Sequence, residues 1–177
     1  MKKKWKKLGS KIIHKNPWWI LREDDVICPN GNKGKYYVVD MNSVAVIAED
    51  KDGGIYLVGQ TRYPIGNIYS WEVIAGGIKS GASSLVAAKQ ELKEEAGLLA
   101  KKWINLGYFY PGSGYSSERT TLYLAKGLKK TEQSLDSTED ITIRKEKIDK
   151  IVKMIKSNEI TCGMTIAAIY KYLLYKN

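Results

Sequence analysis

The sequence predicts a three-layer α/β fold, in which a mixed sheet lies between helices. Short apolar runs separated by turn residues fill much of the first 125 residues and indicate strands. One amphipathic helix is expected in the middle of the chain, at about residues 83–97, and two more helical stretches follow at the end. With 177 residues, the chain fits one domain with a small extension and can bury a sizeable core.

The first part of the chain is expected to be a basic tail followed by a small β-rich piece. Five lysines stand among the first seven residues and predict a solvated, mobile tail. Residues 11–40 lack a helical period and contain the turn cluster CPNGNKG. These residues include four large aromatic side chains, Trp18, Trp19, Tyr36 and Tyr37. The rings are expected to belong to a hydrophobic core, to a dimer interface or to a surface on which a base stacks. We therefore divide the chain into a dimerisation piece, residues 1–40, and a main domain, residues 41–177.

The main domain begins with a predicted hairpin, because two apolar runs at 43–49 and 55–60 flank DKDGG. Further strands are expected at 69–74, 103–110 and 120–125. A helix with outward lysines is expected from about residue 145, since apolar residues recur there at helical spacing. A last helix is expected at 161–175, and its predicted buried side comprises Ile166, Ile169, Tyr170, Leu173 and Leu174.

Composition excludes several classes of site. His14 is the single histidine, which argues against a His-rich zinc site and a Ser-His-Asp triad. Cys28 and Cys162 lie far apart without metal-ligand spacing, and we expect both to be reduced in a cytoplasmic protein. Chemistry in this chain must therefore depend on carboxylates.

The charge pattern does not select one kind of partner. The net charge of +10 suits nucleic acid, an anionic surface or phosphate-bearing small substrates. We expect no specific nucleic-acid partner. No apolar run reaches the 18 or more residues of a membrane span, and the basic N-terminus lacks the apolar region of a signal peptide. No membrane association is expected.

The helix at 83–97 carries the most informative pattern. Ser83 or Ser84 suits the N-cap, and Gly97 suits a left-handed residue at the C-terminal end. At about 100° per residue, Glu91 and Glu95 project together from the edge of the apolar stripe, while Glu94 points toward solvent. Two like charges beside the core are costly unless a cation lies between them. Oxygen ligands suit Mg²⁺ or Mn²⁺, and the alternative is a solvated acidic helix end.

Together with the preceding loop, this helix resembles the Nudix box, G-x5-E-x7-R-E-U-x-E-E-x-G-U, in which U is a bulky aliphatic residue. The first glycine is Gly76, and the matching helix positions are Glu91, Leu92, Glu94, Glu95, Gly97 and Leu98. Two positions depart from the pattern, because Ala82 replaces the first glutamate and Gln90 replaces the arginine. These two residues usually pair in the family, so one salt bridge is absent while the metal carboxylates remain. Residues 41–177 are then expected to form a Nudix hydrolase domain.

Outside the box, residues 17–173 resemble the ADP-ribose pyrophosphatase branch of the Nudix hydrolases. The resemblance rests on QTRYP, WEVIAGG, PGSGYSSER with Pro111, LDSTEDI and TIAA, in this order. It implies that metal is bound by Glu91, Glu95, Glu139 and the Ala75 carbonyl, with Glu94 nearby. It further implies that Arg62 reaches the diphosphate, for which a guanidinium is well matched, and that Glu118 faces the terminal ribose. Trp18 and Tyr36 occupy positions where some relatives sandwich the adenine between two subunits of a homodimer.

The loop at 135–141 departs from the branch at the expected general base. Relatives often carry D-E-x-E there, whereas this chain has Asp136-Ser137-Thr138-Glu139. A serine without a histidine is a poor acceptor for a proton from water at neutral pH. Glu139, Glu94 or a metal-bound hydroxide must then activate the water, or the enzyme is slow.

The leading hypothesis is a Mg²⁺-dependent hydrolase, with Mn²⁺ as the alternative ion, that cleaves ADP-ribose or a related nucleoside diphosphate sugar. The resemblance implies a nucleoside monophosphate and a sugar phosphate as products. Another diphosphate, such as GDP-mannose or a dinucleotide, is the second enzymatic hypothesis. Ala82, Gln90 and Ser137 support a third, a nucleotide-sugar binding or sensor domain with weakened catalysis.

Overall fold

The structure is a computed structural model that describes residues 3–79 and 81–177. Its backbone contacts divide the chain into two compact units. The first unit comprises Met1–Asn42 and Tyr110–Arg119, and the second comprises Ser43–Phe109 and Thr120–Asn177. Each unit has its own sheet, and each is described separately below.

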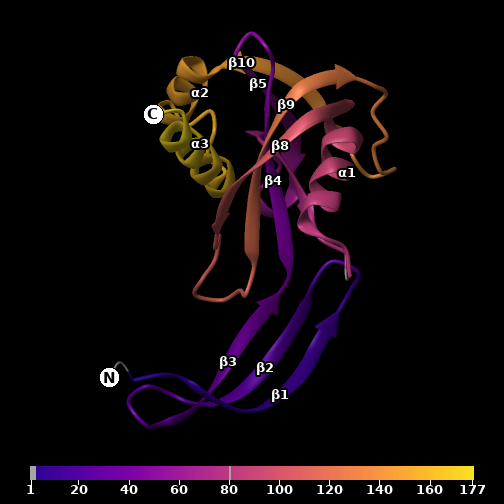
Figure 1. Cartoon of the computed structure of the whole chain (residues 1–177). Coiled ribbons are helices and arrows are strands. Elements are labelled where there is room, and N and C mark those ends of the chain that lie inside the picture. The colour runs from indigo at the N-terminus through magenta and orange to yellow at the C-terminus, as the bar shows by residue number, and fades with distance from the viewer. Residues whose placement is uncertain (1–2, 80) are drawn as a thin grey trace. The chain divides into compact units, whose positions relative to one another are not determined.

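The first unit contains an antiparallel sheet of three strands in the order β1-β2-β3 (Figure 1). Its strands are β1 (Lys6–Lys15), β2 (Ile20–Ile27) and β3 (Lys33–Asp40). Lys6 and Lys7 pair with Ile27 and Val26, so the expectation that these two lysines belong to a mobile tail was wrong. Backbone pairing with β2 extends the strand toward the N-terminus.

A segment distant in sequence completes the first unit. The loop at 110–119 lies along β3, where the Val39 N–H donates to the Tyr115 carbonyl at 2.9 Å and the Ser117 N–H donates to the Val39 carbonyl at 3.0 Å. The Tyr36 hydroxyl donates to the Gly114 carbonyl at 2.7 Å. The pattern of PGSGYSSER did not predict this pairing, because its partner strand lies about seventy residues earlier.

The second unit is built on a seven-stranded sheet in which the main path runs β10-β5-β4-β9-β8. Strand β6 pairs with β5, and β7 pairs with β4. The strands are β4 (Asn42–Glu49), β5 (Gly54–Arg62), β6 (Ile68–Glu72), β7 (Ile74–Gly77), β8 (Leu98–Phe109), β9 (Arg119–Lys130) and β10 (Thr142–Lys147). A 3₁₀ turn, η1 (Tyr63–Ile65), follows β5.

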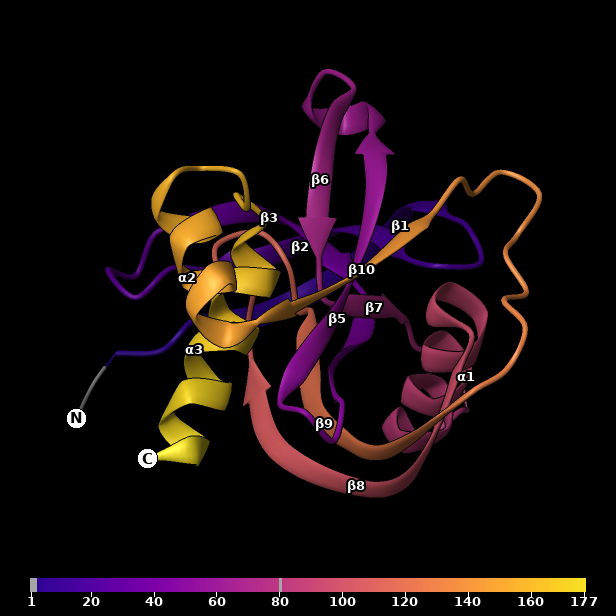
Figure 2. The ribbon, with the colours of Figure 1, turned by 90° about the horizontal axis from the view of Figure 1, so that it is seen from above.

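Helices cover both faces of this sheet. Strand β4 is buried along nearly its whole length, and its alternate residues point into two separate cores. Val44 and Val46 contribute to the core beneath α1 (Ser84–Ala96), whereas Ala45 and Ile47 contribute to the core beneath α2 (Ile148–Lys156) and α3 (Gly163–Lys176). Figure 2 shows α1 on one side of the sheet and α2 with α3 on the other. The predicted three-layer α/β/α arrangement is confirmed.

Two expectations about the C-terminal region were wrong, one of them only in part. Residues 142–147 form strand β10, which pairs with β5, and the helix begins at Ile148. The buried face of the last helix was predicted only in part: Ile169 is buried and Leu173 is partly buried, as expected, but the other buried residues are Thr165, Ala168 and Tyr172. Ile166, Tyr170 and Leu174 are exposed. The small residues Thr165 and Ala168 permit close approach, and the Thr165 hydroxyl accepts a hydrogen bond from the Val73 N–H at 3.1 Å.

Candidate functional site

The local sequence fixes both ends of helix α1 and thereby the direction of its carboxylates. The Ser83 hydroxyl accepts a hydrogen bond from the Val86 N–H, as expected for an N-cap. Gly97 has φ 57° and ψ 41°, the left-handed conformation that glycine adopts without strain. The predicted helix is therefore confirmed within one residue at its start, and its buried stripe places Glu95 against the sheet.

Glu95 is an almost completely buried carboxylate with little compensation. Its side chain is 5% exposed, and its Oε2 accepts one hydrogen bond, from the Ala75 N–H at 3.0 Å. Burial raises the pKa of Glu95 to about 8, against the effect of the Ala75 hydrogen bond and with help from the charges of Glu91 and Glu139. No cationic side chain in the described residues forms a salt bridge with it.

Glu91 lies against the backbone of strand β7. A Cβ atom at Gly76 would collide with the Glu91 carboxyl group, so the glycine leaves room for this carboxyl group. Burial, followed by the charges of Glu94 and Glu139, raises the pKa of Glu91 to about 7, while Lys79 acts in the opposite direction. Glu139 therefore acts electrostatically on both Glu91 and Glu95, and the loop after β9 approaches the helix.

These carboxylates have the chemistry of a site for a hard divalent cation. Glu91 and Glu95 offer anionic oxygens four residues apart, and the cost of holding two such charges together is relieved when a cation joins them. The residue types therefore fit a divalent ion, which Glu91 and Glu95 would hold with Glu139 from the loop. Within residues 3–79 and 81–177, no three His, Cys, Asp or Glu side chains already stand together as a ligand cluster.

The carboxylates of Glu94 and Glu139 each accept a hydrogen bond from a nearby residue of their own segment. The Gln90 amide donates to Glu94 Oε1 at 2.9 Å, so the residue that replaces the expected arginine holds this carboxylate. In the loop, the Asp136 N–H donates to Glu139 Oε2 at 3.1 Å. Ser137 lies in the same turn, between these two residues, and is exposed.

Arg62 forms a two-point ion pair with a residue that the sequence did not single out. Its Nε donates to Glu72 Oε1 at 2.9 Å and its Nη2 donates to Glu72 Oε2 at 2.6 Å. Donation of these hydrogen bonds to Glu72 is the main reason that the pKa of Arg62 is raised above its ordinary value. Glu72 interrupts the apolar run YSWEVI, and a charged residue inside a buried strand is the signal that could have identified it.

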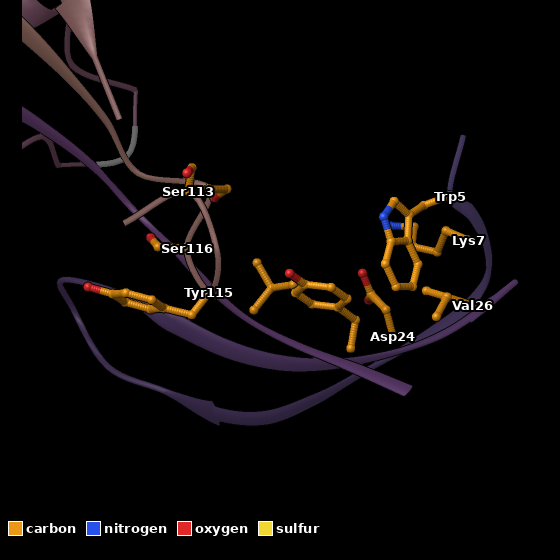
Figure 3. A pocket seen from close by; sticks show the side chains of 10 residues that line it. Trp5, Lys7, Asp24, Val26, Ser113, Tyr115 and Ser116 are labelled. Carbon is orange, nitrogen blue, oxygen red and sulfur yellow. The ribbon is translucent and has the colours of Figure 1, made fainter. Parts of the chain in front are cut away.

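Three of the expected substrate-binding residues belong to the first unit. Tyr36 lines a cavity of about 400 Å³ together with Trp5, Lys7 and the loop at 113–117. Figure 3 shows the Trp5 side of this cavity, near Asp24 and Val26, and the opposite side, formed by Ser113, Tyr115 and Ser116. The ring of Tyr36 packs edge-on against Trp5, at 5.3 Å between centroids. The sequence did not predict a role for Trp5, which precedes the first expected strand.

Trp18 and Glu118 lie outside that cavity lining. Trp18 is 68% exposed in the turn after β1, and no ring contact to it occurs within the described part of the chain. Glu118 is half-buried in the loop at 110–119, where its N–H donates to the Ser116 hydroxyl at 2.9 Å. That Trp18 and Tyr36 sandwich the adenine from two subunits stays a prediction.

Family models account for most of the chain. Residues 5–39 match the nucleoside diphosphate sugar hydrolase N-terminal domain, and residues 40–159 match the NUDIX domain. The second match covers more than half of the sequence and includes the whole of helix α1. The chain belongs to the Nudix family. The resemblance of the box is therefore confirmed, despite Ala82 and Gln90.

Relatives of this Nudix protein cover most of its length. It is 32% identical to the ADP-ribose pyrophosphatase of Bacillus subtilis (strain 168), over 86% of this chain and 83% of that protein. It is 34% identical to the methanol dehydrogenase activator of Bacillus methanolicus, over 84% and 82%. It is 30% identical to the ADP-ribose pyrophosphatase of Mycobacterium tuberculosis (strain ATCC 25618 / H37Rv), over 92% and 80%.

A solved structure of an ADP compounds hydrolase has the same fold. It superimposes with a TM-score of 0.83, covering 97% of this chain and 94% of the other, at 18% sequence identity. Together with the family match and the relatives, the fold makes the chain a Nudix pyrophosphohydrolase. In the part of the chain that the structure describes, no helix is long and apolar enough to cross a membrane.

Proposed function

We propose that this Nudix enzyme hydrolyses the diphosphate bond of ADP-ribose or a related nucleoside diphosphate sugar. For ADP-ribose the products are AMP and ribose 5-phosphate. Two of the relatives described above are named ADP-ribose pyrophosphatases, and residues 5–39 match a model named for nucleoside diphosphate sugar hydrolases. The observation that carries the proposal is the pair Glu91 and Glu95, of which Glu91 is half-buried and Glu95 almost completely buried, and neither of which forms a salt bridge within the described residues.

The chain's own residues divide the work between metal binding and substrate binding. Glu91 and Glu95, with Glu139 and the Ala75 carbonyl, would hold Mg²⁺ or alternatively Mn²⁺, since hard oxygen ligands suit both ions. A bound divalent ion supplies Lewis acidity to the phosphate oxygens and lowers the pKa of water. Arg62 would contact the diphosphate, and its charge offsets negative charge on the leaving phosphate.

The chemical step is the attack of water on one phosphorus atom of the diphosphate. The water oxygen forms the new P–O bond, the bridging P–O bond breaks, and the proton of the water passes to a carboxylate. Ser137 cannot take this proton effectively. Glu139 is the remaining candidate acceptor, because Glu94 is held by Gln90, but Glu139 would also bind the metal ion, so no carboxylate would serve as base alone.

The first unit is proposed to form a homodimer and to hold the base. Residues 1–40 carry several large apolar side chains that are about half exposed, and a partner subunit would cover them. These include Trp5, Leu8, Ile12, Ile13, Trp18 and Tyr37. Trp18 and Tyr36 would hold the adenine between them, with one ring from each subunit. Sedimentation at micromolar concentration tests this proposal, and a monomer would contradict the shared site.

Product analysis tests the proposed reaction. Purified protein is incubated with ADP-ribose, GDP-mannose and a dinucleotide, with and without Mg²⁺ or Mn²⁺, and the products are separated by chromatography. We expect metal-dependent release of AMP and ribose 5-phosphate from ADP-ribose. Binding of ADP-ribose without turnover under every metal condition would instead support a sensor domain.

We further propose that the protein is cytoplasmic. The free cysteines Cys28 and Cys162 agree with this location.

A further inference from the structure

The contact between Arg62 and Glu72 restricts the arginine more than a single ion pair would. Two nitrogens of the guanidinium donate to the two oxygens of one carboxylate, at 2.9 and 2.6 Å. Such a two-point contact fixes the plane of the guanidinium as well as its position. The Arg62 side chain is 38% exposed, whereas the Glu72 side chain is 9% exposed. Arg62 therefore points toward solvent from a buried anchor.

Glu72 is itself held from several directions. Burial raises the pKa of Glu72, but the hydrogen bonds and the charge of Arg62, with smaller effects of Ser70 and Cys162, outweigh burial and leave its pKa below the ordinary value. The neighbouring residue Val73 donates its N–H to Thr165, in the first turn of α3. The start of α3 thus supports the strand at the position of Glu72, and the carboxylate is a fixed, charged anchor.

Two of the three guanidinium nitrogens of Arg62, Nε and Nη2, donate to Glu72, and Nη1 takes no part in that contact.

We propose that Glu72 is a positioning residue, which holds the Arg62 guanidinium toward the substrate diphosphate. This inference rests on the proposed function, because it takes the diphosphate as the ligand of Arg62. Glu72 does not touch the reacting atoms and acts through Arg62.

Removal of the Glu72 charge distinguishes two roles of this residue, the positioning of Arg62 and a purely electrostatic effect on the substrate. If Glu72 acted only through its negative charge, Glu72→Gln would strengthen the binding of an anionic substrate. If it positions Arg62, the same substitution weakens binding, since the guanidinium loses its fixed orientation. The two explanations therefore predict opposite changes in KM. Glu49→Gln is the matched control, because Glu49 is also buried and ion-paired in the second unit but contacts Lys126 and Lys176.

The experiment measures steady-state kinetics with ADP-ribose for the parental protein, Glu72→Gln, Arg62→Ala and the double variant. We expect Glu72→Gln to raise KM roughly tenfold, the size expected for losing a hydrogen bond to a charged group, with a smaller change in kcat. In the Arg62→Ala background the same substitution should add nothing, and Glu49→Gln should leave KM unchanged. A KM that stays constant or falls in Glu72→Gln, or effects that add in the double variant, would overturn the proposal.

A spectroscopic measurement tests the positioning without substrate. The ¹H–¹⁵N signal of the Arg62 Nε–H should be shifted in the parental protein by its bond to Glu72 and should move toward the free-arginine position in Glu72→Gln. An unchanged signal would contradict the proposal even if ADP-ribose is not a substrate, so the two failures are distinguishable. Should Glu72→Gln not fold, Glu72→Asp keeps the charge but shortens the side chain, and a partial rise in KM with a partial shift of the signal is expected.

Discussion

Glu49 and Glu95 are both 5% exposed carboxylates in the second unit, yet their surroundings differ completely. Glu49 lies between the ammonium groups of Lys126, at 3.2 Å, and Lys176, at 3.0 Å. Burial raises its pKa, but the two lysines outweigh burial and hold that pKa below the ordinary value. Glu95 has a backbone N–H and two neighbouring carboxylates instead, and its pKa is raised to about 8.

The difference in salt-bridge partners distinguishes Glu49, a structural carboxylate, from Glu95, which we propose to be a ligand of a bound cation. Buried charges are usually paired within the chain, because an unpaired one costs folding free energy. Within the described residues, Glu49 forms salt bridges with two lysines and Glu72 with one arginine, whereas Glu91 and Glu95 form none. We propose that a cation from outside the chain stabilises this pair, which is the central claim of the proposed mechanism.

The largest expected effect on turnover follows from removing the carboxylate of Glu95. Glu95→Gln keeps the shape of the side chain and should lower metal-dependent turnover by at least about 10²–10³-fold. The metal-free protein should be no less stable than the parental protein, since the substitution relieves repulsion between like charges. Rates of AMP release and thermal unfolding are compared for both proteins. Parental turnover in the variant would contradict the assignment of Glu95.

The second prediction concerns Ser137, at which a carboxylate is introduced by substitution. If Ser137 leaves the water without an efficient base, Ser137→Glu should raise kcat, within the 10²–10⁴-fold range of general-base catalysis, with little change in KM. Higher pH should partly replace the missing base in the parental enzyme. A fast parental enzyme that Ser137→Glu does not improve would show that Glu139 or Glu94 already accepts the proton.

The third prediction uses pH, which should act on the two carboxylates in opposite directions. The folded-state pKa of Glu49 is lowered, so its contribution to stability is present above the unfolded value of about 4.5 and is lost as pH falls through the folded value. The pKa of Glu95 is raised to about 8, so the metal-free fold loses stability as pH rises from about 4.5 to 8.

Urea unfolding of metal-free protein across this pH range checks both signs. The stability difference between the parental protein and Glu49→Gln should shrink in acid. The difference between the parental protein and Glu95→Gln should grow between pH of about 4.5 and 8, to the disadvantage of the parental protein. Equal pH dependence in all three proteins would remove the physical basis of the comparison.

The smallest expected effect is the loss of the paired carboxylate. Glu49→Gln should lower the free energy of unfolding by about 1–2 kcal/mol, a value reduced for screening because Lys126 and Lys176 are more than a third exposed. Turnover per folded molecule should not change. Thermal unfolding and kinetics measure the two quantities. A loss of activity larger than the loss of folded protein would mean that Glu49 also serves the reaction.

Local patterns were sufficient to predict the helix that carries the site. Ser83, Gly97 and the apolar stripe determine the limits of α1, and the spacing of Glu91 and Glu95 determines that they project together. The hairpin of β4 and β5 was also expected, from the two apolar runs that flank DKDGG, and the two strands pair antiparallel. Such features depend on residues a few positions apart, for which helix and strand geometry are nearly invariant.

Features that depend on distant contacts could not be predicted. Strand β10 was missed because its pairing with β5, across about ninety residues, outweighs the local helical pattern near Lys145. The exposed face of α3, including Tyr170, was expected to be buried because the position of Thr165 against Val73 is not visible in the sequence. Glu72 was passed over for the same reason, since its partner Arg62 is identified only when β5 and β6 pair.

Calorimetric titration of Mg²⁺ into the metal-free protein near neutral pH, repeated with Mn²⁺, tests the central claim most directly. The account predicts that the parental protein and Glu49→Gln bind the ion with the same affinity and that Glu95→Gln binds it at least about tenfold more weakly. Glu49→Gln and Glu95→Gln remove the same charge from equally buried positions, so general electrostatics alone would affect both alike. Equal affinity in Glu95→Gln and the parental protein, or equal losses in the two variants, would contradict the account.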